Sequence, residues 1–194
     1  MEAPLHENPL HEIPMTRLLL LVAFAAALVV PRPGQSTDAP EPVQVFLVRH
    51  AEKVADGTRD PLLTEEGEAR AEALARLLGE AGVTHLYSTD LERTRRTLAP
   101  LPAALESEVR ELPARDVQGL LGELQALPAG SVAVVSGHSN TVPWLVRSLG
   151  GEVPGLPQGN LDEKEYDRLF LVTLATDGSA ATSLELRYGA PSAD

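Results

Sequence analysis

Two histidines and two arginines of this sequence stand at or just beyond apolar, strand-like runs, where they could act together on phosphate. Arg49 and His50 end the run LVRH, Arg93 lies in LERTRR, and His138 lies in SGHSN. Arginine presents a planar fork of donors that matches phosphate oxygens. A neutral imidazole is a competent nucleophile toward phosphorus, and a second imidazole can stabilise the charge of the transferring group. These residue types therefore point to phosphoryl transfer.

Three short strands must position these residues. Runs of apolar or β-branched residues predict them, namely VQVFLV at 43–48, VTHLYS at 83–88 and SVAVVS at 131–136. The second run ends in Ser88, which is followed by Thr89 and Asp90. Each predicted strand therefore leads directly into polar groups.

A helix is predicted between the first two strands, over residues 63–82. Thr64 is followed by acidic residues and is typical of a helix N-cap. Its expected apolar stripe consists of Ala73, Leu74, Leu77 and Leu78.

Later segments continue the alternation of helix and strand. The spacing of leucines predicts a helix over 115–127 with Asp116 as its N-cap, and another helix is predicted over 141–150. The segments 168–175 and 182–189 predict a C-terminal hairpin.

This order of elements predicts an α/β fold built on a mainly parallel sheet. Helices would cover both faces, and ligands would bind beyond the carboxyl ends of the strands. The two histidines and two arginines would then share one pocket. The nearby arginine charge would lower a histidine pKa below its usual value of about 6.5 and keep one ring neutral near pH 7.

Composition narrows the class of protein. The chain has 194 residues, 43% of them hydrophobic, which suits one ordinary globular domain. Its formal net charge of −12 argues against a nucleic-acid partner, because phosphate backbones are held by basic surfaces. The absence of cysteine excludes disulfides, thiolate catalysis, iron–sulfur clusters and cysteine-ligated zinc.

Residues 1–40 are predicted to be a leader and a Pro-rich linker, and residues 41–194 the folded domain. The leader contains the uninterrupted apolar run LLLLVAFAAALVV at 18–30, preceded by Met15-Thr16-Arg17. A run of this length fits a signal peptide better than a spanning helix of about 20 residues. The alternatives are a core helix or a retained membrane anchor, and the natural start could be Met1 or Met15.

The same segments resemble a known family. LVRHAEK resembles the Arg-His-Gly-type signature of the histidine phosphatase superfamily, also called phosphoglycerate mutase-like, with an alanine in place of the usual glycine. YSTDLERTRRT resembles its second block, in which a strand-end serine precedes a phosphate-binding arginine by five residues, here Ser88 and Arg93. VVSGHSNTVP resembles the block that carries the second histidine, here His138, and DPLLTEEG matches a further family segment. The resemblance covers about residues 43–175 in the family's order.

What the resemblance implies is a three-layer α/β/α sandwich and a phosphohistidine intermediate. Carried over by residue, His50 is the nucleophile, while Arg49, Arg93 and His138 hold the phosphoryl oxygens, with Ser88 beside them. No metal and no cofactor are implied. The compact bacterial-type phosphatases are the branch that it suggests.

The general acid that protonates the leaving oxygen is harder to assign. Many family members place a carboxylate between the second block and the second histidine, and Asp116 is our choice, with Glu111 second. An equal alternative is that Asp116 serves only as the helix cap. Some compact members lack this acid.

Simpler interpretations exist for each segment. Arg93 lies in a charged run that could be a solvated helix face, and His138 could belong to a helix cap. The sequence GHSNT echoes the G-x-S-x-G of serine hydrolases, but ends in Thr141. There is no G-x-x-x-x-G-K-[ST] for a nucleotide hydrolase.

The predicted function is hydrolysis of phosphomonoesters, with a phosphorylated small molecule or phosphoprotein as partner. Phosphoglycerate mutase-like phosphotransfer and a decayed phospho-ligand binding module are the alternatives. About 150 residues remain after the leader, whereas the cofactor-dependent mutases are longer chains that enclose their substrate. The leader predicts export to the periplasm or outside the cell, and any membrane anchoring would use residues 18–30 alone.

Overall fold

The computed structural model describes residues 40–105, 108–156, 158–177 and 179–192. The predicted leader, including its apolar run at 18–30, lies outside the described residues. Among those that are described, no helix is long and apolar enough to cross a membrane.

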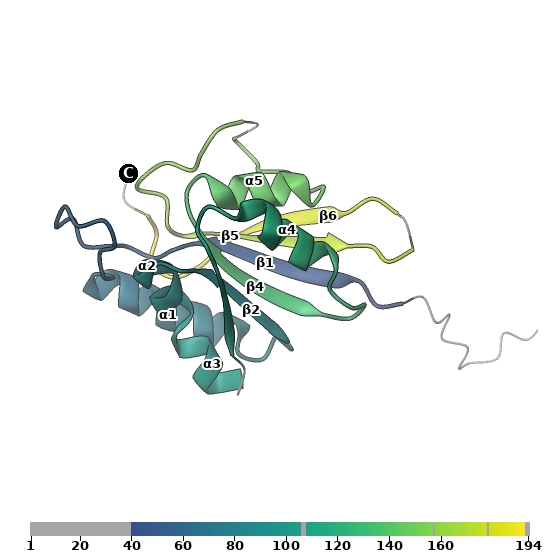
Figure 1. Ribbon diagram of the computed structural model, residues 1–194, viewed down its shortest axis with the longest axis horizontal. Helices are drawn as coiled ribbons and strands as arrows, with labels where there is room; N and C mark the ends of the chain where they lie inside the picture. The colour runs from purple at the N-terminus through teal and green to yellow at the C-terminus, as the bar shows by residue number, and fades with distance from the viewer. Residues whose placement is uncertain (1–39, 106–107, 157, 178, 193–194) are drawn as a thin grey trace, which may run out of the picture. The chain divides into compact units, whose positions relative to one another are not determined.

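A six-stranded sheet forms the middle of the described domain, in the order β3-β2-β4-β1-β5-β6 (Figure 1). The strands are β1 Val43–Arg49, β2 His85–Thr89, β3 Val109–Leu112, β4 Val132–Gly137, β5 Arg168–Leu174 and β6 Thr182–Arg187. The first four in the sheet order pair in parallel, whereas β5 is antiparallel to β1 and to β6. The mainly parallel sheet and the C-terminal hairpin are thus confirmed.

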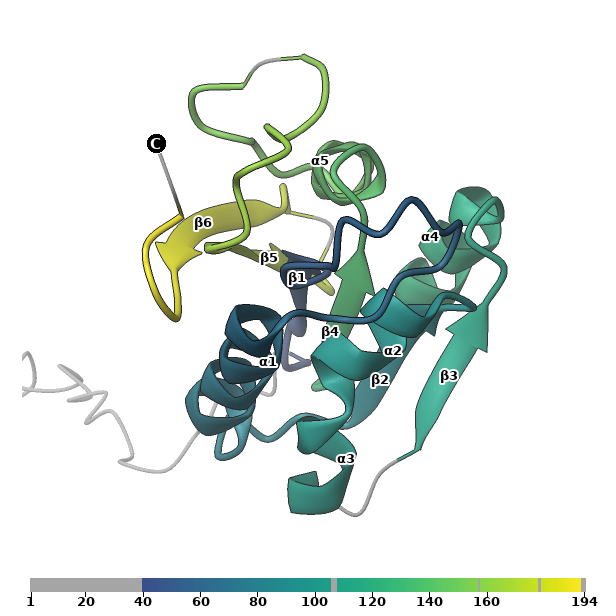
Figure 2. The same cartoon turned by 90° about the vertical axis from the view of Figure 1, so that its left-hand side faces the viewer.

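Helices cover both faces of this sheet, which gives the three predicted layers (Figure 2). They are α1 Glu65–Leu78, α2 Glu92–Leu98, α3 Pro100–Leu105, α4 Val117–Gln125 and α5 Thr141–Ser148. Strand β1 shows the division, because successive side chains of a strand point to opposite faces. Val45 and Leu47 pack with α4 and α5, whereas Phe46 and Val48 pack with α1 and α2.

The predicted helix caps are present, and Leu74 and Leu78 are buried as expected, but one residue of that apolar stripe was wrong. Thr64 accepts a hydrogen bond from the Gly67 N–H, and Asp116 accepts one from the Gly119 N–H. Leu77, expected on the buried face of α1, is 49% exposed. The buried face is rotated toward the small residues of the helix, since α1 buries Gly67, Arg70, Ala71, Leu74, Ala75 and Leu78.

Two short elements were not predicted, β3 and α3. Strand β3 has only four residues, VREL, and its side chains are exposed or half-buried, so its sequence carries no apolar run. It is held by parallel pairing with β2, from Leu86 opposite Val109 to Thr89 opposite Leu112. This edge pairing extends the sheet on the side of Ser88 and Thr89.

Candidate active site

Parallel pairing of neighbouring strands brings the two histidines together at the carboxyl edge of the sheet. Arg49, at the end of β1, lies opposite Gly137, at the end of β4. The His50 N–H donates to the Gly137 carbonyl at 2.8 Å, and the His50 and His138 ring centroids are 5.6 Å apart. A cavity of about 340 Å³ opens here, lined by Arg49, His50, Lys53, Leu91, Arg93, Ala114, His138, Ser139, Asn140, Thr141 and Glu163.

His50 is held in one orientation and kept neutral. Its Nδ1 lies 2.8 Å from the Ala51 carbonyl oxygen, which can only accept, so Nδ1 carries the proton and Nε2 keeps its lone pair. Burial lowers the pKa of His50 to about 3; the Ala51 hydrogen bond opposes this shift, and the nearby positive charge of Arg49 adds to it. The ring is therefore uncharged near pH 7, with the Nε2 lone pair that a nucleophile would need.

His138 is half-buried and is also neutral near pH 7. Burial first, and then the positive charges of Arg93 and Arg49, lower its pKa to about 4. Its Nε2 lies 3.2 Å from the Thr89 hydroxyl, at the end of the neighbouring strand β2. Its backbone N–H donates to the Thr141 hydroxyl at the start of α5. Both neighbouring elements thus fix the position of this imidazole.

Arg49 is 2% exposed and crosses from β1 to the loop before β5. It donates to the Asp162 carbonyl at 2.6 Å and to the Glu163 carboxylate at 3.0 Å. Its guanidinium lies 4.3 Å from the centroid of the Tyr166 ring, within the range of a cation–π contact. Its buried Nε has no hydrogen-bond partner among the described residues.

Arg93 enters the cavity from the first turn of α2. Its closest carboxylate is that of Asp60, 3.5 Å away, which also accepts the Glu92 N–H at the start of the helix. The side chain is 15% exposed, and its Nε is a second buried donor without a partner in the described part of the chain. Burial lowers the pKa of Arg93, with Asp60 opposing that shift. A guanidinium has so high a pKa that it stays charged all the same.

Two of the predicted site residues do not line this cavity. The Ser88 hydroxyl is fully buried and donates to the Thr89 carbonyl at 3.0 Å. Asp116 caps α4, with its carboxylate 2.9 Å from the Gly119 N–H, and lines a separate narrow pocket under Thr89. Glu111, the second choice for the acid, pairs with Arg95 at 3.2 Å. The cap assigned to Asp116 is present, and its role as an acid stays a prediction.

Several residues that shape the site were missed by the sequence analysis. Asp60 fixes Arg93, and the Thr97 hydroxyl accepts the Ala51 N–H at 2.8 Å while donating to the Arg93 carbonyl at 2.7 Å. Tyr166 lies against Arg49 from a segment more than 100 residues away. DPLLTEEG was the only sequence signal near any of them. A threonine on a helix or a tyrosine before a strand gives no local sign of such a contact.

The described residues contain no cluster of three or more His, Asp or Glu arranged to hold a metal ion. Among the polar groups that line the cavity are two neutral imidazoles and two guanidinium ions. The two guanidinium ions form an anion site, and the unprotonated Nε2 of His50 lies beside it. This arrangement is suited to phosphoryl transfer.

Comparison with known proteins agrees with this chemistry. The model of the histidine phosphatase superfamily (branch 1) matches residues 45–120. Curated relatives in Shigella dysenteriae and Escherichia coli, both named "Probable phosphoglycerate mutase GpmB", are 40% identical over 140 residues. That match spans 66% of this chain and 60% of each relative.

Solved structures show the same fold. The protein histidine phosphatase SixA complexed with tungstate is 25% identical, with a TM-score of 0.58 over 76% of this chain and 97% of that one. A SixA from Nakamurella multipartita, described as a putative phosphohistidine phosphatase, is 22% identical, with a TM-score of 0.56 over 79% and 99%. A mycobacterial glucosyl-3-phosphoglycerate phosphatase is 16% identical, with a TM-score of 0.55 over 76% and 98%. With its paired histidines at the strand ends, its matching sequence blocks and this shared fold, the chain is similar to the histidine phosphatase superfamily, whose model matches residues 45–120.

Proposed function

We propose that the protein is a phosphatase that hydrolyses phosphomonoesters through a phosphohistidine on His50. One observation supports this most directly: the neutral, oriented His50 lies beside two guanidinium groups whose buried Nε atoms have no partner in the described residues. Burying a donor without a partner costs about 1–3 kcal/mol. A bound phosphoryl group would supply acceptors to both arginines.

In the first proposed step, Nε2 of His50 attacks phosphorus and the bond to the leaving oxygen breaks. The electron pair of that bond stays with the oxygen, which takes a proton from a general acid or leaves as the anion. Arg49, Arg93 and His138 hold the three phosphoryl oxygens and stabilise their charge. The Glu163 carboxylate must then give up its place on Arg49; it is 78% exposed, so water can solvate it, while the phosphoryl oxygens replace it on the buried guanidinium.

In the second step, water attacks the phosphohistidine. A proton from the water is accepted by the conjugate base of the acid or by solvent, inorganic phosphate forms, and Nε2 of His50 regains its lone pair. Protonation of either imidazole becomes easier while the phosphate dianion is bound, because a nearby negative charge favours the charged ring. His138 can then donate a hydrogen bond to a phosphoryl oxygen.

We favour hydrolysis over mutase activity because the connections that follow β2, β3 and β4 beside the site have only two to four residues each. Such short connections leave room for water as the acceptor. A mutase would instead have to keep the sugar acid enclosed between two transfers, and an assay for isomerisation of phosphoglycerate separates the two functions.

Replacing His50 with Ala should abolish hydrolysis of an aryl phosphate. The wild-type protein, quenched in acid-free denaturant during turnover of a ³²P-labelled substrate, should carry an alkali-stable, acid-labile label on His50. Because no metal takes part in these steps, the wild-type protein should keep both its hydrolytic activity and its phosphohistidine label in EDTA.

His85→Ala is the matched control, since this histidine begins β2 away from the cavity and its loss should leave turnover unchanged. A folded His50→Ala protein that keeps its activity would overturn the mechanism. A wild-type protein that binds phosphate without hydrolysing any phosphomonoester would favour the decayed binding module.

A further inference from the structure

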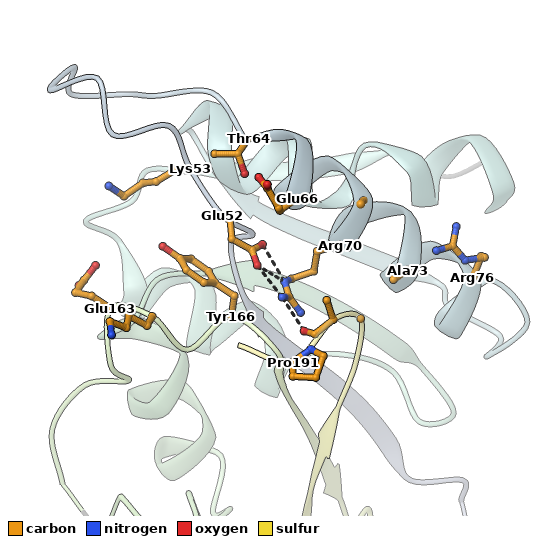
Figure 3. A pocket seen from close by; sticks show the side chains of 14 residues that line it. Glu52, Lys53, Thr64, Glu66, Arg70, Ala73, Arg76, Glu163, Tyr166 and Pro191 are labelled. Atoms are coloured by element: carbon orange, nitrogen blue, oxygen red, sulfur yellow. Dashed lines mark hydrogen bonds and ion pairs between the residues drawn. The ribbon is translucent and has the colours of Figure 1, made fainter. Parts of the chain in front are cut away.

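A second cavity, of about 840 Å³, lies beside the first, along helix α1 and under the C-terminal segment (Figure 3). Half of its lining residues are charged, but most of the wall surface is hydrocarbon. The small or apolar lining residues are Ala69, Ala73, Tyr166, Gly189, Ala190 and Pro191. A cavity of this size is within the range of small-molecule sites.

The two cavities adjoin at one end, where they share two lining residues. Lys53 and Glu163 line both of them. Tyr166, which lines the larger cavity, has its ring centroid 6.1 Å from that of His50. In Figure 3 these three residues gather at one end of the cavity and Arg76 lies at the other, beyond Ala73. A group attached to a phosphoryl at His50 can therefore extend along α1.

The most buried cation of this cavity is already satisfied by the protein. Arg70 is 3% exposed and donates to the Glu52 carboxylate through Nε and Nη2. Nη1 also donates to the Tyr188 carbonyl and Nη2 to the Ala190 carbonyl, both at 2.9 Å. Most N–H donors of Arg70 are thus used within the protein, and they fasten the segment after β6 to α1. What the cavity presents to a ligand is mainly hydrocarbon.

We propose that this cavity binds the leaving group of the substrate, and that this group is elongated and largely apolar, such as a ring system or a hydrocarbon chain. The inference rests on the proposed function for its phosphoryl end only. A small phosphorylated sugar acid would leave most of the cavity unfilled. The preferred substrates are therefore phosphomonoesters of bulky apolar alcohols or phenols.

Binding of two phosphonates, which cannot be hydrolysed, tests this subsite by calorimetry. The wild-type protein should bind 4-biphenylylphosphonate about tenfold more tightly than phenylphosphonate, because the second ring buries apolar surface. In Ala69→Trp, an exposed position on the cavity wall, the ratio should fall to about one, and Ala73→Phe should do the same from another part of the wall. Leu77→Trp places a tryptophan on the exposed face of the same helix, outside the cavity. This control variant should keep the affinity ratio of about ten.

Equal affinities of the wild-type protein for the two phosphonates would overturn the proposal, as would a tenfold ratio that survives both cavity-filling variants. Turnover of phenyl phosphate and 4-biphenylyl phosphate, whose leaving groups have similar acidity, tests the proposed function separately. Hydrolysis of both at equal efficiency would support the phosphatase and exclude the subsite. A biphenyl preference in binding without any hydrolysis would support the subsite and exclude the phosphatase.

Discussion

At the scale of single residues, burial decides the chemistry of the two histidines. A solvated imidazole is partly protonated near neutral pH and then has no lone pair to offer. At the strand ends, removal from water lowers the pKa of His50 to about 3 and that of His138 to about 4. The hydrogen bond of Nδ1 to Ala51 then leaves Nε2 as the reactive atom. The arginine charge from which a lowered histidine pKa was predicted does contribute to the shift at His50, but burial is the larger cause.

The lowered pKa of His50 predicts a dependence of stability on pH. Below about pH 6.5 the unfolded chain binds a proton at this histidine that the folded protein does not bind, so stability falls as pH falls from 6.5 toward about 3. Between pH 7 and pH 5 the wild-type protein should lose about 2 kcal/mol more than His50→Asn, whose amide can still donate to the Ala51 carbonyl. Urea unfolding of both proteins at pH 7, 6 and 5 measures this difference. Parallel pH profiles would show that His50 titrates normally in the folded protein.

Asp116 poses a second question at this scale, because its carboxylate caps α4. If it is also the general acid, Asp116→Asn should slow hydrolysis of an alkyl phosphate by about 10²-fold or more. An aryl phosphate with an acidic phenol should lose much less, since its leaving group needs no proton. Comparing kcat on the two substrates measures the selectivity.

Equal losses on the two substrates would assign Asp116 to the cap alone. Glu111→Gln is then the variant to compare, although Glu111 pairs with Arg95. If neither variant is selective, the site works without a general acid, which favours labile substrates such as phosphohistidine.

At the scale of elements, the site depends on how helix α2 is tied to the loop after β1. The Thr97 hydroxyl accepts a hydrogen bond from the Ala51 N–H and donates one to the Arg93 carbonyl. It thereby connects the loop that follows His50 to helix α2. The N-cap residue of α2, Leu91, has no side chain that can accept a hydrogen bond. Asp60, in the loop after β1, supplies the missing acceptor for the Glu92 N–H and also forms an ion pair with Arg93.

Asp60→Ala should therefore weaken phosphate binding more than it slows the chemical step. Loss of a helix-capping acceptor costs about 1 kcal/mol of stability, and a mobile Arg93 should raise KM for an aryl phosphate severalfold, with a smaller change in kcat. Steady-state kinetics and thermal unfolding measure both effects. Asp56→Ala is the control, because this exposed carboxylate bonds only to Thr58 among the described residues. A variant of Asp60 with unchanged KM would show that Arg93 holds its position without this ion pair.

At the scale of the whole molecule, the parts that could be predicted from sequence are those with a local pattern. Apolar runs located β1, β2 and β4, and their parallel order placed Arg49, His50 and His138 at one edge. Strand β3 could not be predicted because an exposed edge strand needs no apolar run. The contacts of Tyr166 and Glu163 with Arg49 could not be predicted because only the folded chain brings these residues together. The larger cavity could not be predicted for the same reason, since its walls come in part from α1 and from the segment after β6.

Export is the remaining prediction at this scale, and it rests on the sequence of the leader. We propose that the leader within residues 1–40 directs the domain out of the cytoplasm. The apolar run at 18–30 follows Arg17 and precedes a Pro-rich linker, as in secretory signals. A bacterial alkaline phosphatase without its own signal is active only after export, so a fusion to residues 1–42 should be active. A fusion that starts at Met15 should be active as well.

Charges in the apolar run should abolish this activity, because each arginine at the centre of such a segment costs about 2.5–3.5 kcal/mol for insertion. The double variant Leu21→Arg and Ala25→Arg should leave the reporter inactive in the cytoplasm. Gln35→Arg adds a charge in the linker instead and should leave the reporter active. Fractionation of the active fusions then separates a cleaved leader, which releases soluble reporter, from a retained anchor, which keeps it with the membrane. An inactive wild-type fusion, made at the same level as an active control with a known signal, would overturn the prediction of export.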